Sequence, residues 1–550
     1  IAGYTPSGRI GIRTGRWTLT ASGSGSFTPV AESRFTETRE QAGQPLPFAG
    51  RSDSKSRTNY GRGHFSAVFD PTPKHTAGFD IEYTERSTHM PTLSRTTLGQ
   101  TQSDSRYRQH MDGNTLTATA NYIWKIDTLG SQFKLIADYT RYTSDGDNSY
   151  HTTTCAPGTL RDSLYESATG SVYDILTADA GLTRKLPHGL TLRAGLRYTR
   201  NDMADKSRYA AQTQGTWLAL PEYSYDQHYT EQIGAAYASL EYSAGRWELS
   251  AGLRGEYTSV ASQAFGRSYF GLFPNVSVSR ALNALRTWLL VAQWSRNIER
   301  PAFPALNPAR IRISDYSWQS GNPSLRPTYI HRFSLTAVWK YRYTLTVGGN
   351  LHHDLIREIA HRDATAPDAV YIRPENHYTE NHWFVAASVP AKITRWWNLS
   401  VNAVGVMQRI RLNSTDSPAT HYLMFADATC SFTLPAGFFA EAAYRAQSRL
   451  YSGNSEVGPR HTLSATVKKQ LFDKRLTLFC TLSNITGCDW EFASLTDGMR
   501  RTIDTRQAWS GRLWKVGAAW NFRTGKKFRA RTVESAAETQ RKRLVKSTEQ

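Results

Sequence analysis

Apolar and polar side chains alternate along this chain in segments of about ten residues. In the segment that begins at Trp17, every second residue is apolar or small, and the residues between them are threonine or serine. The same period of two returns in residues 190–199, 247–257 and 514–523. Successive side chains of a β-strand point to opposite faces, so this pattern predicts strands that separate two different media. Aromatic residues recur at the segment ends, as they do where strands cross a membrane–water interface.

Short turns and long polar connections follow one another in strict alternation between these segments. The short turns fall near residues 13–16, 70–74, 127–131, 186–189, 243–246, 280–286, 340–342, 390–395, 435–437 and 470–474. Examples of the long connections are residues 28–60, 142–171, 201–232 and 484–510. Strict alternation places every short turn on one rim and every long loop on the other, which is the arrangement of an outer-membrane barrel. A soluble sandwich of the kind found in surface adhesins is the alternative for the strands, but it does not share one rim of short turns.

The turns also permit a count of strands. The ten short turns are flanked by twenty strands, and the strand that ends at Phe522 is the twenty-first. The segment up to Ile12 runs down into a short turn, so a barrel whose termini both face the periplasm needs one more strand before Ile1. We therefore predict an all-β fold, a transmembrane antiparallel up-and-down barrel of about 22 strands with about 21 in this chain. Barrels of that size hold a plug in the lumen.

One long connection is rich in proline and follows the strand that ends near Trp294. Proline removes backbone donors, and Gly-Asn tolerates unusual backbone angles, so this stretch is neither helix nor strand and forms a shaped loop. The residues that define its pattern are Arg300, Pro301, Asn307, Pro308, Gly321, Asn322, Pro323 and Pro327. Further context lies in residues 235–237, 247–256, 272–274 and 390–397, and in the last strand.

Together these motifs resemble the barrel portion of TonB-dependent outer-membrane receptors, in the variant common in the Bacteroidetes, the outer membrane protein beta-barrel family. The resemblance covers most of the chain. It implies an importer in the outer membrane of a Gram-negative bacterium, which captures a ligand with extracellular loops and passes it to the periplasm by TonB-dependent, energy-coupled transport. The implied partners are outer-membrane lipid and lipopolysaccharide, TonB through a plug domain encoded upstream of residue 1, and a surface lipoprotein. It implies no cofactor.

A second class of function stays open at this point. The 550 residues contain neither a plug nor a TonB-coupling box, so a passive pore or a structural barrel subunit of a surface assembly is the alternative. No run approaches the ~20 apolar residues of a membrane helix. The sequence also has no signal peptide at its first residues.

Charge divides the chain into two parts, which we predict to be the barrel in residues 1–523 and a basic periplasmic tail in residues 524–550. The net charge is +20, and the tail holds eight Lys and Arg against three Glu. The tail has no alternation and few aromatics, which predicts a solvated segment that is mostly disordered or briefly helical. A specific docking peptide is the alternative for the tail. Basic charge also suits nucleic acid, but no compact basic and aromatic module is present, so we expect anionic lipid or solute instead.

Two sets of residues are candidates for function. In the proline-rich loop, Arg310, Arg312, Tyr316 and Trp318 offer cations and aromatic rings to an anionic or ring-bearing ligand. The signature residues of the same loop are expected to shape it rather than to touch ligand. On one face of a wall strand, Arg246, Glu248, Arg254 and Glu256 predict a lumen charge ladder that holds a plug.

The sequence does not predict an enzyme. It has no nucleophile elbow and no phosphate-binding glycine loop. His352 and His353 are adjacent on a strand and point to opposite faces, so they do not chelate one ion, and we predict no metal site. Cys430 and Cys480 fit apolar strand faces, whereas Cys155 and Cys488 lie in loops and pair only if those loops meet.

Overall fold

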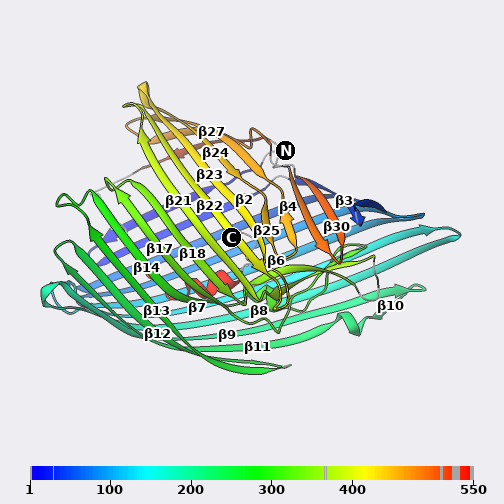
Figure 1. Cartoon of the computed structure of the whole chain (residues 1–550), viewed down its shortest axis with the longest axis horizontal. Helices are drawn as coiled ribbons and strands as arrows, with labels where there is room; N and C mark the ends of the chain where they lie inside the picture. Colours follow the sequence, from blue (N-terminus) through cyan, green and yellow to red (C-terminus); the bar gives the residue numbers. More distant parts are fainter. Residues whose placement is uncertain are drawn as a thin grey trace.

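The computed structural model describes residues 3–28, 30–41, 43–263, 265–363, 366, 368–487, 489–507, 512–522 and 533–544. In this part of the chain, 27 strands form one sheet that winds around a lumen (Figure 1). Six of them lie in the long connections, and the other 21 form the wall. Among the described residues, no helix has the length and apolar character needed to cross a membrane.

The wall strands follow one another in chain order, each antiparallel to the next. They are β1 (Ser7–Thr14), β2 (Trp17–Phe27), β4 (Gln44–Thr72), β5 (His75–Leu98), β6 (Thr101–Lys125), β7 (Gln132–Ala156), β8 (Thr159–Lys185), β9 (Leu190–Thr213), β11 (Tyr225–Ala244), β12 (Trp247–Ser262), β13 (Gly266–Ala281), β14 (Trp288–Glu299), β17 (Thr328–Trp339), β18 (Tyr343–His353), β21 (Thr379–Lys392), β22 (Trp397–Arg411), β23 (Ala419–Leu434), β24 (Phe438–Gln447), β27 (Arg460–Leu471), β28 (Leu476–Ser483) and β31 (Leu513–Trp520). The predicted all-β antiparallel architecture and the number of strands in this chain are confirmed.

The remaining elements lie in the connections and near the C-terminus. Six strands extend the large sheet: β3 (Ala31–Gln41), β10 (Thr216–Ala219), β25 (Leu450–Ser452), β26 (Ser455–Val457), β29 (Trp490–Thr496) and β30 (Met499–Gln507). A separate four-stranded sheet contains β15 (Ile311–Ser314), β16 (Ser317–Gln319), β19 (Ile356–Arg362) and β20 (Val370–Asn376). The helical turns are η1 (Pro187–Gly189), η2 (Pro221–Tyr223), α1 (Phe303–Leu306), η3 (Pro435–Gly437), α2 (Glu538–Arg541) and η5 (Lys542–Leu544).

The two ends of the wall are not paired with each other in the described residues. The wall partner of β1 is β2, and the partner of β31 is β28. Because every step along the wall is antiparallel, β1 and β31 run in the same direction. An antiparallel bacterial barrel closes over an even number of strands. The described residues supply 21 wall strands, and the further strand expected from the sequence stays a prediction.

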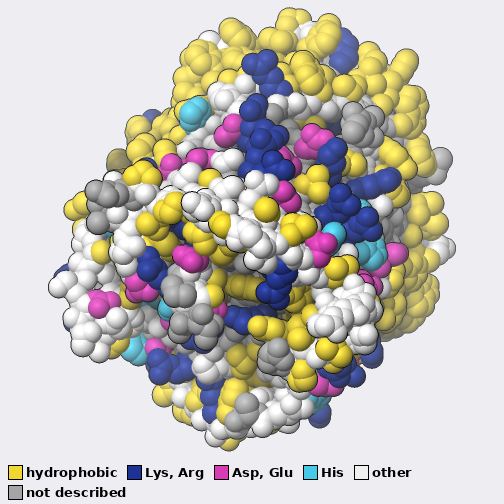
Figure 2. All heavy atoms as spheres, turned by 90° about the vertical axis from the view of Figure 1, so that its right-hand side faces the viewer, with side chains coloured by type: hydrophobic (Ala, Val, Ile, Leu, Met, Phe, Trp, Pro, Cys, Tyr) yellow, Lys and Arg dark blue, Asp and Glu magenta, His cyan; other side chains and the backbone are white. Residues whose placement is uncertain are grey.

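The wall is apolar outside and polar inside. On the outer face the large side chains are exposed, for example Phe270 at 64%, whereas inward-facing Thr258 is completely buried. Burial of polar groups and exposure of apolar ones would be costly in water, but lipid solvates the outer face and polar groups satisfy one another inside. Figure 2, which faces the end where β3 and β10 lie, shows hydrophobic side chains along the upper and right-hand border and Lys and Arg gathered over the centre.

The wall strands differ in length on the two sides of the barrel. β4 has 29 residues and β7 has 25, whereas β14 has 12 and β18 has 11. About 9–11 residues suffice to cross the hydrocarbon. The strands on the β4–β9 side therefore project well beyond it, and their upper inner faces form one side of the mouth.

Candidate functional site

The proline-rich loop leaves the wall at the end of β14 and returns at the start of β17. Glu299 and Thr328 are paired across these strands, so the loop starts and ends at neighbouring positions. Between them lie α1, which has a proline in its first turn, and the hairpin of β15 and β16. The loop is thus a folded unit at the rim where the long connections lie.

Apolar side chains of this loop are buried against the inner wall. Phe303, Leu306 and Leu325 are almost fully buried and form one cluster with wall residues that include Tyr173 and Val260. Complete burial of a side chain of this size stabilises by about 1.5–3 kcal/mol. The loop therefore folds into the lumen instead of extending away from the barrel.

The first signature residue, Arg300, fixes the loop to the wall by charge. Its guanidinium donates to the Glu256 carboxylate and to the Thr258 hydroxyl, both at 2.8 Å. A second carboxylate, that of Glu231, lies 3.8 Å from the Nε of Arg300. Two carboxylates and a hydroxyl compensate the charge of this buried guanidinium. Arg300 therefore holds the loop in position.

The next signature residues bring the two halves of the loop together. The backbone amides of Gly321 and Asn322 donate to the carbonyls of Asn307 and Ala305, at 2.9 and 2.7 Å. A Cβ on Gly321 would lie 2.1 Å from the Asn307 carbonyl oxygen, so only glycine fits this close approach. Asn307 also accepts a hydrogen bond of 2.5 Å from the Tyr225 hydroxyl of the wall.

The prolines of the signature occupy the corners of the loop. Pro308 and Pro323 each follow an asparagine of the closure, and Pro327 is buried directly before β17. The Pro301 carbonyl accepts a hydrogen bond from Arg543 near the C-terminus, at 2.9 Å.

A second outer connection completes the mouth. The connection between β18 and β21 contributes β19 and β20, and β20 pairs in parallel with β16 of the proline-rich loop. Ser317 and Trp318 lie opposite Val370 and Tyr371 in this register. Two successive outer loops therefore form one four-stranded sheet, which gives the mouth a defined surface.

The Trp318 ring is close to both candidate arginines. The guanidinium carbons of Arg310 and Arg312 are each 5.3 Å from the centre of its ring, and the Tyr223 ring is stacked parallel to it at 6.5 Å. Arg310 also lies 3.2 Å from Asp363 and keeps 35% of its side chain exposed. Cation and ring faces of this kind attract anions and flat groups.

Arg312 is more deeply held than Arg310. Its side chain is 11% exposed and pairs with Asp315 at 2.6 Å. Asp315 in turn accepts hydrogen bonds from Ser105 and Tyr107 on β6, at 2.6 and 2.8 Å. The sequence suggests equal roles for the two arginines, but the structure separates a half-exposed Arg310 from an Arg312 that ties the loop to the wall.

Tyr316, the fourth candidate, packs at the side of the mouth. Its ring meets the Phe48 ring edge-on, with centroids 5.8 Å apart, and its carbonyl accepts a hydrogen bond from the Val370 amide. Burial raises the pKa of its hydroxyl above the ordinary value of tyrosine. Tyr316 thus lies in the turn of the β15–β16 hairpin and packs toward β4 instead of joining the Arg310–Trp318 group.

The four residues of the predicted charge ladder lie at two different levels. Arg246 and Glu248 are exposed near a short turn. Arg254 and Glu256 face the lumen higher up and are paired at 2.5 Å. The upper pair joins Arg300 of the loop, so in this structure it holds the loop.

A cluster of histidines surrounds one buried carboxylate at the rim. Glu380 is paired with Arg357 at 3.0 Å and with His382 at 2.8 Å, and His377 lies 3.4 Å away. The His352 ring points to the Glu380 carbonyl, whereas the neighbouring His353 is exposed. No group of three or more His, Cys, Asp or Glu in the described residues is arranged to hold a metal ion.

The cysteines are separate in the part of the chain that the structure describes. Cys155, Cys430 and Cys480 are free thiols, and Cys155 is exposed. Cys488 lies outside the described residues, so its pairing with Cys155 stays open.

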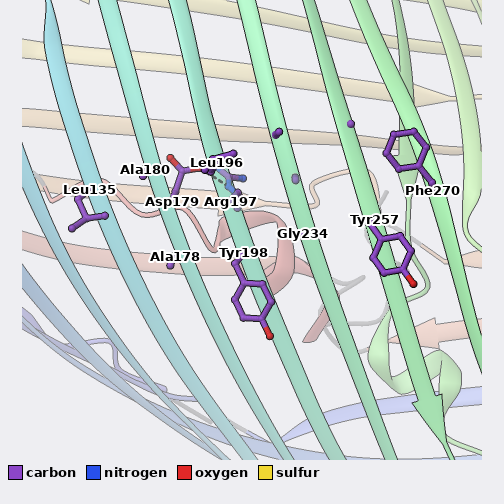
Figure 3. Close-up of a pocket in the computed structure, with 13 residues that line it drawn as sticks. Leu135, Ala178, Asp179, Ala180, Leu196, Arg197, Tyr198, Gly234, Tyr257 and Phe270 are labelled. Atoms are coloured by element: carbon purple, nitrogen blue, oxygen red, sulfur yellow. Dashed lines mark hydrogen bonds and ion pairs between the residues drawn. The ribbon is translucent and has the colours of Figure 1, made fainter.

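A groove of about 740 Å³ lies on the outer face of the wall rather than at the mouth. It crosses strands from β7 to β13 and is flanked by Tyr198, Tyr257 and Phe270 (Figure 3). Asp179 and Arg197 on the same strands are paired with each other at 2.7 Å. Since its flanking rings belong to the exposed apolar face, we interpret this groove as lipid-facing.

Part of the predicted C-terminal tail lies near the site. Of the predicted tail, residues 524–532 and 545–550 lie outside the described residues. Val533–Leu544 contains the short helical turns α2 and η5, and its residues Arg543 and Leu544 contact the wall and the proline-rich loop. Composition could not reveal this, since its partners are single acidic and amide groups far away in the sequence.

A wall with an apolar outer face, a polar inner face and folded loops at one mouth defines an outer-membrane β-barrel protein. The model of the outer membrane protein beta-barrel family matches residues 124–520, and the chain belongs to that family. Its place is the outer membrane of a Gram-negative bacterium. None of the curated proteins that were compared matches it.

Solved structures of receptors and transporters share this fold. The ferripyoverdine receptor of the outer membrane of Pseudomonas aeruginosa is 11% identical, with a TM-score of 0.53 over 92% of this chain and 71% of that one. The ferric-catecholate import receptor Fiu from K12 E. coli is 9% identical, with a TM-score of 0.50 over 87% and 81%. The copper transporter OprC is 10% identical, with a TM-score of 0.50 over 88% and 81%. At these identities the likeness is one of fold.

Proposed function

We propose that this chain is the barrel of an outer-membrane receptor that captures its ligand at the outer loops and imports it. The observation that carries the proposal is the shaped mouth, where two loops share one sheet. The proline-rich loop presents Arg310 and Trp318 there, and the connection before β11 adds Tyr223. A passive pore does not need such a built surface. The protein is a transport receptor rather than an enzyme.

The ligand that suits this surface is anionic and carries rings. Arg310 supplies a half-exposed cation, and the stacked Trp318 and Tyr223 supply ring faces. Ferric chelates of the kind named for the ferripyoverdine and ferric-catecholate receptors combine both properties. They are therefore the first compounds to test.

Energy coupling and partners follow from the resemblance of the loop signature. We propose that import is TonB-dependent, that a plug domain encoded before residue 1 contacts TonB, and that the protein is of the Bacteroidetes type. Lipopolysaccharide and outer-membrane lipid contact the apolar face, and a surface lipoprotein is a proposed partner at the mouth. No cofactor is required for capture.

The test is ligand affinity after loss of Trp318. The purified full chain in detergent is titrated with ferric siderophores, haem and oligosaccharides, and binding is followed by calorimetry. For the compound that binds, Trp318→Ala is expected to raise Kd at least tenfold, because stacking on an aromatic ring is lost. Trp247→Ala on the outer face is the control and should leave Kd unchanged. An unchanged Kd in Trp318→Ala removes this surface from the site.

The alternative, a passive pore or a structural subunit of a surface assembly, makes an opposite prediction. The intact protein in planar bilayers should conduct steadily if it is a pore. A receptor whose lumen holds folded segments should be nearly silent. Steady conductance together with no binding to any compound of the panel would favour the alternative.

A further inference from the structure

The C-terminal segment Val533–Leu544 begins at the short-turn end of the barrel. Val533 lies against Gly78, where an added Cβ would be 2.9 Å from the valine Cγ2. The Glu534 carboxylate pairs with the Lys134 ammonium at 2.6 Å. Gly78 and Lys134 are each within three residues of the strand starts that follow short turns. The segment therefore enters the lumen at the rim that faces the periplasm.

From there the segment climbs along the inner wall. The Ala536 amide donates to Asp138 at 2.7 Å, six residues above the start of β7. Higher up, Gln540 accepts from Asn201 at 3.3 Å, eleven residues above the start of β9. At about 3.3 Å per residue along a strand, these contacts lie at successively greater heights. Figure 1 shows the red helical segment within the outline of the barrel.

Arg543 makes the uppermost polar contacts. Its guanidinium donates to the Glu231 carboxylate at 2.5 Å, to the Pro301 carbonyl at 2.9 Å and to Gln540 at 2.8 Å. It also lies 4.2 Å from the centre of the Phe303 ring. Leu544 packs against the apolar cluster beneath the loop. Arg543 is thus held both by the wall and by the underside of the proline-rich loop.

The site that receives Arg543 is a cation site in the wall. The Glu231 side chain is only 2% exposed and accepts a hydrogen bond from the Asn201 amide at 2.8 Å, and its other cation, Arg300, is 3.8 Å away and is shared with Glu256 at 2.8 Å. A buried carboxylate without a close cation is costly. The wall therefore favours an arginine-bearing peptide at this point, and the chain supplies one from its own C-terminus.

We propose that Val533–Leu544 is a lumenal strap, a segment that docks on the inner wall through Arg543 and Glu231 and ties the proline-rich loop to the periplasmic end. While docked, the strap occupies part of the lumen and holds the loop from below. Its release frees the underside of the loop and widens the lumen. This inference goes beyond ligand capture and does not depend on which ligand binds.

The first experiment is a disulfide between strap and wall. Asn201→Cys and Gln540→Cys are combined in the full chain, with the native cysteines replaced by serine, and the protein is oxidised in outer-membrane vesicles. A cross-linked peptide pair found by mass spectrometry is the expected result. The control pairs Gln540→Cys with Leu196→Cys, which lies on the same strand but faces outward, and no cross-link is expected there. Equal cross-linking of both pairs, or of neither, overturns the proposal.

The second experiment tests the contact that holds the strap. In Arg543→Ala the strap is expected to be cut at least tenfold faster by trypsin added from the periplasmic side. In the control Lys542→Ala the cleavage rate at the other sites should be unchanged, because Lys542 is 71% exposed and pairs with the equally exposed Glu538, whereas Arg543 is 7% exposed. Equal cleavage in all variants and the parent contradicts the strap.

Folding is checked separately in each variant. A folded barrel keeps its heat-modifiable migration on gels. Where a proteolysis variant loses this migration, the proposal is judged by the cross-linking experiment instead. Ligand affinity in the same preparations distinguishes the two proposals. A strap that fails both tests in a protein that still binds ligand leaves the receptor function standing.

Discussion

The proline-rich loop and the C-terminal segment both lie in the lumen, but different forces hold them. The loop is held by apolar residues that are almost fully buried, Phe303, Leu306 and Leu325. The segment is held largely by charge, with Arg543 at Glu231 and Glu534 at Lys134. Salt screens the partly exposed Glu534–Lys134 pair, whereas the Arg543–Glu231 pair is buried and is screened much less. The loop is therefore a fixed part of the fold, whereas the segment is the more readily released of the two, because its lower contact is partly exposed.

The largest expected effect comes from removing an apolar contact of the loop. Phe303→Ala leaves a cavity in the lumenal cluster and should destabilise the loop by about 3–5 kcal/mol. Hydrogen exchange of the Gly321 and Asn322 amides should accelerate at least a hundredfold. Phe270→Ala, on the lipid face, is the matched control and should leave these amides protected. Unchanged exchange in Phe303→Ala would show that the cluster does not hold the loop.

A somewhat smaller effect is expected from Arg312→Ala. The change leaves Asp315 buried with hydroxyl donors but without its cation, at a cost of about 3 kcal/mol. The loop amides should then exchange about a hundredfold faster. Arg310→Ala is the comparison, because Arg310 is half-exposed and should affect ligand affinity more than loop protection. The reverse ranking would mean that the two arginines have exchanged roles.

The closure of the loop is tested by Gly321→Ala. The added Cβ would press on the Asn307 carbonyl, and overpacking of this kind costs about 1–3 kcal/mol. Ligand affinity and protection of the loop should fall together. Gly405→Ala is the control, since nothing lies within 4 Å of its Cβ position. If Gly321→Ala behaves like Gly405→Ala, the two halves of the loop do not need their close contact.

Much of the fold could be predicted from the sequence because a barrel wall is built from local patterns. Period-two alternation and the order of short and long connections depend on neighbouring residues. The alternation predicted the strands, and the order of connections predicted that all short turns lie on one rim. The pairing of β16 with β20 could not be found this way, because it joins two different connections. The same holds for Asp315 with Tyr107 and for Glu231 with Arg543, which are long-range contacts of single side chains.

The smallest expected effect concerns the lower end of the C-terminal segment. Lys134 pairs with Glu534 at 2.6 Å, but the Glu534 side chain is about half-exposed, so the pair contributes only about 0–1 kcal/mol. Lys134→Ala should therefore raise tryptic cleavage of the strap no more than about fivefold at low salt, and less at high salt. Loop protection should not change, because the apolar cluster is intact. A large increase in cleavage in Lys134→Ala that does not depend on salt would contradict this expectation. It would mean that the segment is held mainly at its lower end and not at Glu231, and that the contact there is not an ion pair screened by salt.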